Sequence, residues 1–145
     1  MLIAVDTNIL VYAHRRDSIF HEAAVRSVVV LAGGSGQWAI PWPCLQEFIG
    51  IVTRPRVFDP PSTLAEAVDQ VDVWLASPSI VMLAEADDHW RHLKETLLVS
   101  RTIGAKVHDA RIAAICLQHG VRELWTADRD FGRFPQLRTV NPLVR

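Results

Sequence analysis

Four acidic residues, far apart in the chain, occupy positions where catalytic carboxylates are expected in a parallel sheet. Asp6 follows a short apolar run that is typical of a buried strand, and Asp128 follows the fourth predicted strand. Asp109 lies at the predicted start of a helix after a glycine-containing loop, and Glu47 lies on the helix after the second predicted strand. Open α/β sheets bind ligands at the carboxyl ends of their strands, so these side chains are predicted to converge on one edge.

Carboxylates brought that close repel one another, and a hard divalent cation such as Mg²⁺ or Mn²⁺ would offset the repulsion. Zinc is a weaker fit because no His or Cys pair has the usual ligand spacing. A divalent ion among carboxylates suits hydrolysis of a phosphodiester by activated water, with a 5′-phosphate and a 3′-hydroxyl as expected products. The sequence has no P-loop, no G-x-G-x-x-G and no G-x-S-x-G, so nucleotide cofactors and serine hydrolysis lack support.

Each acidic position also has a structural explanation that needs no chemistry. Asp6 could cap the helix after the first strand, Asp109 could be an N-cap, and Glu47 could be a solvated helix residue. Asp128 and Asp130 could form only a turn. An aspartate that ends a buried strand is costly without a function, and the positions taken together favour a site.

The predicted elements alternate between strands and helices. Strands are predicted at 2–5, 37–40, 79–83, 123–126 and 138–140, and helices at about 9–14, 21–31, 43–52, 64–75, 88–98 and 109–119. Such alternation predicts an α/β fold with a parallel sheet covered on both faces. The length suits one domain over residues 1–145.

Composition limits the function further. The 145 residues are 50% apolar with a net charge of −1, which excludes a strongly basic nucleic-acid binder but not a local basic patch. Residues 101–145 carry 8 basic and 4 acidic side chains, a net charge of +4. Cys44 and Cys116 form neither a disulfide scaffold nor a zinc site. No signal peptide or membrane span is found, so a soluble cytoplasmic protein is expected.

The sequence around the acidic positions resembles the PIN-domain ribonucleases, and most closely the VapC toxins of bacterial type II toxin–antitoxin systems. The matching motifs run in the same order along nearly the whole chain and comprise Val5-Asp6-Thr7-Asn8-Ile9-Leu10-Val11-Tyr12-Ala13, Gln46-Glu47-Phe48, His108-Asp109-Ala110-Arg111-Ile112-Ala113-Ala114 and Trp125-Thr126-Ala127-Asp128-Arg129-Asp130-Phe131. The resemblance implies a three-layer α/β/α sandwich around a short parallel sheet of four to five strands. It also implies Mg²⁺- or Mn²⁺-dependent RNA cleavage, homodimers, and neutralisation by a VapB-type antitoxin.

Carried over to this sequence, the resemblance assigns a role to each matching residue. The catalytic acids are Asp6, Glu47, Asp109 and Asp128, of which Asp6, Asp109 and Asp128 would hold the metal. The supporting residues are Asn8, which would orient Asp6, Thr126, whose hydroxyl would support the cluster, and Asp130, an auxiliary acid. None of the acidic residues is missing, so an active enzyme is expected.

Contacts to RNA or to the antitoxin are assigned to arginines near these motifs. Arg15 follows the first motif, and Arg111 and Arg129 adjoin acidic residues, although any single arginine is more often a solvated surface residue or part of an ion pair. Three other functions stay open: a housekeeping PIN nuclease that trims RNA, a non-catalytic module whose acidic rim binds a basic partner, and a Mg²⁺-dependent phosphotransfer domain. The last would need an aspartate nucleophile near a lysine.

Overall fold

The computed structural model describes residues 1–144, and Arg145, the last residue of the predicted domain, lies outside them. Its five strands form one parallel sheet in the order β3-β2-β1-β4-β5. The strands are β1 (Ile3–Val5), β2 (Trp38–Pro41), β3 (Ile80–Leu83), β4 (Glu123–Trp125) and β5 (Arg138–Val140). The first strand of the sequence is therefore the central strand of the sheet, and all five carboxyl ends lie at one edge.

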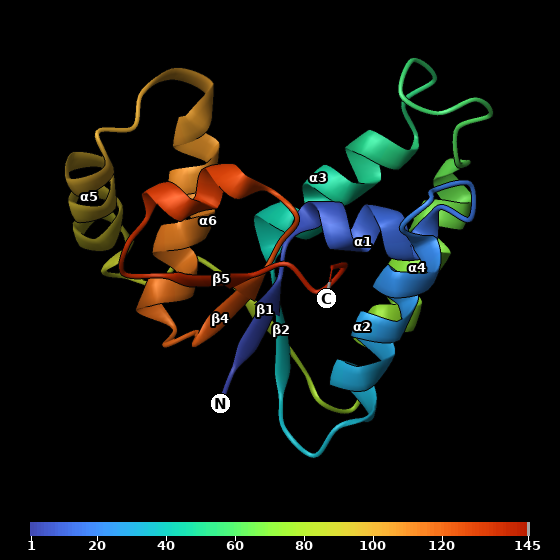
Figure 1. The fold of residues 1–145 in the computed structure, drawn as a ribbon, viewed down its shortest axis with the longest axis horizontal. Helices are drawn as coiled ribbons and strands as arrows, with labels where there is room; N and C mark the ends of the chain where they lie inside the picture. The colour runs from blue at the N-terminus through green and yellow to red at the C-terminus, as the bar shows by residue number, and fades with distance from the viewer. Residues whose placement is uncertain (145) are drawn as a thin grey trace.

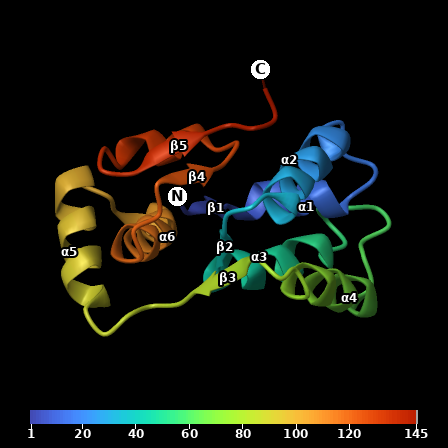
Figure 2. The same ribbon diagram turned by 90° about the horizontal axis from the view of Figure 1, so that it is seen from below.

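Six α-helices cover the two faces of this sheet. They are α1 (Thr7–His14), α2 (His21–Gly33), α3 (Trp42–Val52), α4 (Leu64–Leu75), α5 (His89–Ser100) and α6 (Val107–Gln118), with 3₁₀ turns η1 (Gly104–Lys106) and η2 (Arg129–Arg133). Helices α5 and α6 lie on one side of the sheet and α1 to α4 on the other (Figures 1 and 2). The predicted α/β/α sandwich with a short parallel sheet is confirmed.

The position of the central strands in the core explains why their sequences are short and mostly apolar. Ala4 and Val5 of β1 and Leu124 of β4 are fully buried between the two helical layers. Helix α6 contributes Ala110 and the continuously buried stretch 112–116, because it packs between the sheet and α5. Strands covered on both faces have no polar side to present, so they lose the alternating pattern of a half-exposed sheet.

Local signals fix several helix ends as the sequence predicts. Thr63 caps α4 in a reciprocal capping box, in which its hydroxyl accepts from the Glu66 backbone N–H and the Glu66 carboxylate accepts from the Thr63 N–H. Gly120, with φ of 69°, follows the end of α6 in the left-handed conformation that glycine tolerates best.

The predicted start of α6 is wrong by two residues. The helix begins at Val107 after the η1 turn, so Asp109 lies in its first turn and is not the N-cap. The sequence predicts a loop over residues 103–108, which contains Gly104. Gly104 does turn the chain, with φ of 64°, but the loop is shorter than predicted because the η1 turn leads directly into the helix. Helix α1 likewise begins at Thr7, two residues before the predicted start.

None of the helices within residues 1–144 is both long and apolar enough to cross a lipid bilayer.

Candidate active site

Asp6 lies at the centre of the carboxyl edge, between the end of β1 and the start of α1. Its side chain caps α1, because Oδ1 accepts a hydrogen bond of 2.8 Å from the Thr7 backbone N–H. The Thr126 hydroxyl donates to Oδ2 at 2.7 Å, and the Cys44 thiol lies 3.5 Å from Oδ1. With only 4% of its surface exposed, Asp6 is held in one orientation by neighbours from three elements.

Asn8 and Thr126 connect Asp6 to the end of β4. The Asn8 side-chain amide donates to Asp6 Oδ2 at 3.3 Å and to Thr126 Oγ1 at 3.2 Å, and its carbonyl accepts from the Ala127 N–H at 3.1 Å. The Asp128 N–H donates in turn to Thr126 Oγ1 at 3.0 Å. This network joins the two strand ends that carry Asp6 and Asp128, and in it Asn8 and Thr126 fix the orientation of the Asp6 carboxylate.

The environment of Asp6 makes its ionised form costly. Burial raises the pKa of Asp6 to about 6, although the hydrogen bonds from Thr126, Thr7 and Cys44 lower it. The negative charge of Glu47 raises it further. An aspartate that holds its proton close to neutral pH is typical of a functional site more than of a helix cap.

Glu47 reaches the same edge from α3. Its carboxylate forms an ion pair with the imidazole of His108, the second residue of α6, when that ring is protonated. The charge of Glu47 acts on both Asp6 and Asp109, raising the pKa of each. Helices α3 and α6 come from opposite faces of the sheet, and this acid therefore lies where the two helical layers meet.

Asp109 and Asp128 interact electrostatically at the same edge. Burial raises the pKa of the Asp109 carboxyl, and the charge of Asp128 raises it further, whereas Lys106 lowers it. The Lys106 ammonium is in contact with Asp130 Oδ2 and lies 3.8 Å from Asp109 Oδ2. Asp128 caps η2, since its Oδ1 accepts from the Asp130 N–H at 2.9 Å.

The four acids thus interact electrostatically in pairs at one edge, Asp6 with Glu47, Glu47 with Asp109, and Asp109 with Asp128. Within residues 1–144 no three Asp, Glu, His or Cys side chains surround a single point closely enough to coordinate an ion in this arrangement. The donors nevertheless fit a hard divalent cation, because all are carboxylates and their like charges need an offsetting cation. Lys106 and His108 supply part of that positive charge from within the chain.

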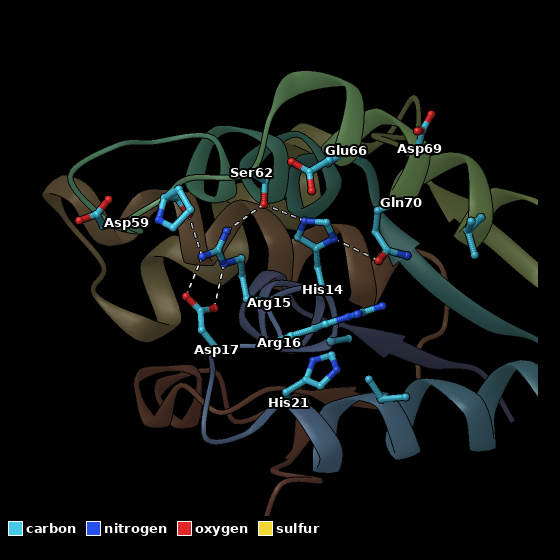
Figure 3. Close-up of a pocket in the computed structure, with 14 residues that line it drawn as sticks. His14, Arg15, Arg16, Asp17, His21, Asp59, Ser62, Glu66, Asp69 and Gln70 are labelled. Atoms are coloured by element: carbon cyan, nitrogen blue, oxygen red, sulfur yellow. Dashed lines mark hydrogen bonds and ion pairs between the residues drawn. The ribbon is translucent and has the colours of Figure 1, made fainter.

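The predicted contact residue Arg15 is engaged elsewhere in the molecule (Figure 3). Its guanidinium forms a two-pronged ion pair with Asp17 and donates to Ser62 Oγ and to the Pro60 carbonyl. It also lies over the ring of Phe58, 4.4 Å from the ring centroid. Only 11% of the side chain is exposed, so Arg15 serves first to hold the segment between α3 and α4 against α1.

This arrangement lines a pocket of about 970 Å³ at the far end of α1 from Asp6 (Figure 3). Its walls come from α1, α2 and α4 and the segment before α4, and none of the four carboxylates lines it. His14 lies at its centre, with Nδ1 3.1 Å from Gln70 Oε1 and Nε2 2.9 Å from Ser62 Oγ. The pocket is therefore separate from the acidic edge.

Arg111 and Arg129 lie nearer to the acids. The Arg111 guanidinium donates to Glu85 Oε1 at 2.7 Å, which places it on the side of the edge where β3 ends. Arg129 is exposed at the start of η2, directly after Asp128. Both residues are accessible to a ligand that approaches the edge.

Sequence reasoning missed three neighbours of the acids. Lys106 and His108 each pair with an acid that is distant in sequence, and no local spacing signals such a contact. Cys44 was interpreted as a small core residue, which is confirmed by its complete burial, but its contact with Asp6 was not foreseen.

Comparison with known proteins agrees with this geometry. The PIN domain family model matches residues 3–137. Ribonuclease VapC43 of Mycobacterium tuberculosis is 34% identical, and the alignment covers 98% of this chain and 96% of that protein. Among solved structures, VapBC2 from Rickettsia felis, bound to a DNA fragment from its promoter, matches with a TM-score of 0.70 at 19% identity, covering 97% of this chain and 98% of the other. VapC20 of M. tuberculosis, described as a Sarcin-Ricin loop cleaving toxin, matches with a TM-score of 0.66 at 18% identity, covering 90% and 92%.

These solved structures share the fold of this chain, and the family model matches the segments that carry all four acids. The chain therefore belongs to the PIN-domain family and, within it, to the VapC ribonucleases.

Proposed function

We propose that this chain, a single domain over residues 1–145, is the toxin of a type II toxin–antitoxin pair and cleaves RNA as a metal-dependent endoribonuclease. Family membership supports the ribonuclease activity. The similar chain from R. felis is described as part of VapBC2, which supports a VapB-type antitoxin as partner. The protein acts in the cytoplasm as a homodimer.

The observation that carries the proposal is the fixed and buried carboxyl of Asp6 at an edge with three further acids. Asn8 and Thr126 hold one oxygen of Asp6, and the α1 N-terminus holds the other. A side chain restrained in this way loses little freedom when it binds a ligand, which is what a metal ligand in an enzyme needs.

Asp6, Asp109 and Asp128 would hold Mg²⁺ or Mn²⁺, which when bound polarises a phosphoryl oxygen and lowers the pKa of a water molecule. Asn8 and Thr126 keep Asp6 in place, and Asp130 keeps η2 folded beside Asp128 through its backbone N–H. Glu47 accepts a proton from the attacking water, because its side chain is 37% exposed and its charge acts on both Asp6 and Asp109. Arg111 and Arg129 contact the RNA backbone or the antitoxin, whereas Arg15 acts chiefly within the fold.

The test is cleavage of total RNA by the purified protein with Mg²⁺, with Mn²⁺ or with EDTA. Asp6→Asn and Asp109→Asn are compared with Asp72→Asn, an exposed carboxylate on α4 outside the edge. Metal-dependent products with 5′-phosphates, lost at least about a thousandfold in the first two variants and retained in the third, are expected.

Four outcomes would reject the proposal in different ways. Cleavage that persists in EDTA with cyclic phosphate ends would exclude the metal mechanism. Full activity in folded Asp6→Asn would remove Asp6 from the site. RNA cleavage without growth arrest when the chain is expressed without an antitoxin would favour a housekeeping nuclease, and hydrolysis of small phosphate esters alone would favour a phosphotransfer enzyme.

A further inference from the structure

The acidic edge already contains one cation, the ammonium group of Lys106. It is in contact with Asp130 Oδ2, it lies 3.8 Å from Asp109 Oδ2, and the charge of Asp128 also acts on it. These three acids come from η2, from α6 and from the end of β4. Lys106 itself lies in η1, directly before α6, and thus extends across the gap between these elements.

Two of these three acids, Asp109 and Asp128, are the residues that we assign to the metal. An ammonium group among them already neutralises part of their charge. It also repels a divalent cation, and the repulsion energy is twice that for a monovalent cation at the same distance. Lys106 and a divalent cation therefore compete for the same carboxylates.

The Lys106 side chain is able to move away from the carboxylates. Lys106 is 43% exposed on a flexible four-carbon stem, and its nearest partner Asp130, at 45%, lies at the outer side of the cluster. The other cationic groups beside the edge are less suited to this role, because His108 pairs with Glu47 and Arg111 with Glu85. Arg129 forms no ion pair within residues 1–144.

We propose that Lys106 is an internal counterion of the metal-free protein, which holds Asp109, Asp128 and Asp130 together and must withdraw from Asp109 and Asp128 when the divalent cation binds. Lys106 is in this sense a positioning residue that sets the affinity for the metal. The inference rests on the proposed function, because it takes the metal site from there.

The test measures the binding of Mn²⁺ alone to the metal-stripped protein by the loss of the free Mn²⁺ signal in electron paramagnetic resonance. Lys106→Met removes the charge, Lys106→Gln removes it with a polar group retained, and Lys106→Arg keeps it. Lys94→Met, at the only other lysine, is the matched control on the exposed face of α5. Asp109→Asn reports whether the ion binds at the acidic edge.

The charge-removing variants are expected to bind Mn²⁺ on the order of tenfold more tightly than the wild type, with Lys106→Arg and Lys94→Met within about twofold of it. Without metal, Lys106→Met is expected to unfold at a lower temperature than Lys94→Met, because three acids then repel one another without a counterion. Equal or weaker Mn²⁺ binding by both Lys106→Met and Lys106→Gln would overturn the inference alone. Absence of Mn²⁺ binding in the wild type, or full binding in Asp109→Asn, would overturn the metal site and the inference together.

Discussion

Asp6 combines two properties that oppose each other. Its carboxylate accepts hydrogen bonds on both oxygens, which favours the charged form, yet burial outweighs them and raises its pKa to about 6. An ordinary aspartate has a pKa near 3.8, so the folded protein holds a proton on Asp6 over a range where the unfolded chain has lost it. The metal-free fold consequently becomes less stable when Asp6 ionises.

This property predicts the pH dependence of Asp6→Asn. Between pH 4 and pH 7 the wild type must ionise a buried group and the variant need not. The free energy of unfolding of the metal-free wild type should therefore fall relative to that of Asp6→Asn, by about 2 kcal/mol over this interval. Urea unfolding in EDTA at several pH values measures the difference, and the constant loss of hydrogen bonds in the variant cancels from it.

Asp72→Asn is the control for this experiment, because Asp72 is exposed on α4. Its difference from the wild type should stay constant over the same pH range within about 0.5 kcal/mol. A difference between Asp6→Asn and the wild type that does not change with pH would mean that Asp6 is ionised at pH 4 and that burial is not the dominant effect.

The acids themselves could be predicted from the sequence, whereas their partners could not. Asp6 follows an apolar run and Asp128 follows the fourth predicted strand, and these local patterns place both at strand ends. Lys106 and His108 meet acids that are remote in sequence, and those contacts exist only once α3, α6 and η2 are packed around one sheet edge. Local spacing carries no information about such pairs.

At the scale of elements, strands and helix interiors were predicted more accurately than helix starts. All five strands lie within one residue of their predicted ends, and the predicted cap at Ser62 or Thr63 is Thr63. The start of α6 was misplaced because Val107 and His108 carry no capping signal, and no side chain caps that helix. The order of the strands in the sheet depends on long-range packing, which no segment reveals alone.

The contact between α1 and α4 depends on a side chain that the sequence did not single out. His14, at the end of α1, bonds to Ser62 before α4 and to Gln70 within it, and packs edge-on against Phe48 of α3 (Figure 3). A group with partners on three separate segments contributes to the stability of their packing, and its distance from the acidic edge separates that role from catalysis.

We therefore expect His14→Leu to lower the free energy of unfolding by about 1–2 kcal/mol, because two hydrogen bonds are lost while the apolar packing on Phe48 is kept. Urea unfolding checks the stability, and the RNA-cleavage rate well below the unfolding temperature should not change. His92→Leu, which removes a partly exposed pair with Asp88, should change stability by less than about 0.5 kcal/mol. Loss of cleavage in a stable His14→Leu protein would instead link this pocket to the reaction.

Over the whole molecule, charge is distributed unevenly in relation to the task. The edge that we assign to RNA cleavage is lined by acids, and the chain carries a net charge of −1, so bulk charge does not attract RNA. Residues 101–145, which include α6, β4 and η2, carry a net charge of +4, but only some of their basic residues, such as Arg129, lie at the edge with the acids. RNA binding should therefore depend on where an arginine lies and not on net charge alone.

Arg122 and Arg129 provide a matched pair for this question, because both are exposed and they lie before and after the same strand, β4. The parallel sheet places Arg129 at the carboxyl edge with the acids and Arg122 at the opposite edge. In an Asp109→Asn background that prevents cleavage, Arg129→Ala should weaken RNA binding about threefold and lower the slope of log affinity against log salt by about 0.7, the value for one phosphate contact to a single strand. Arg122→Ala removes the same charge and should change neither quantity. Equal losses in both variants would show that RNA responds to overall charge, and the carboxyl edge would then lose its role in positioning the substrate.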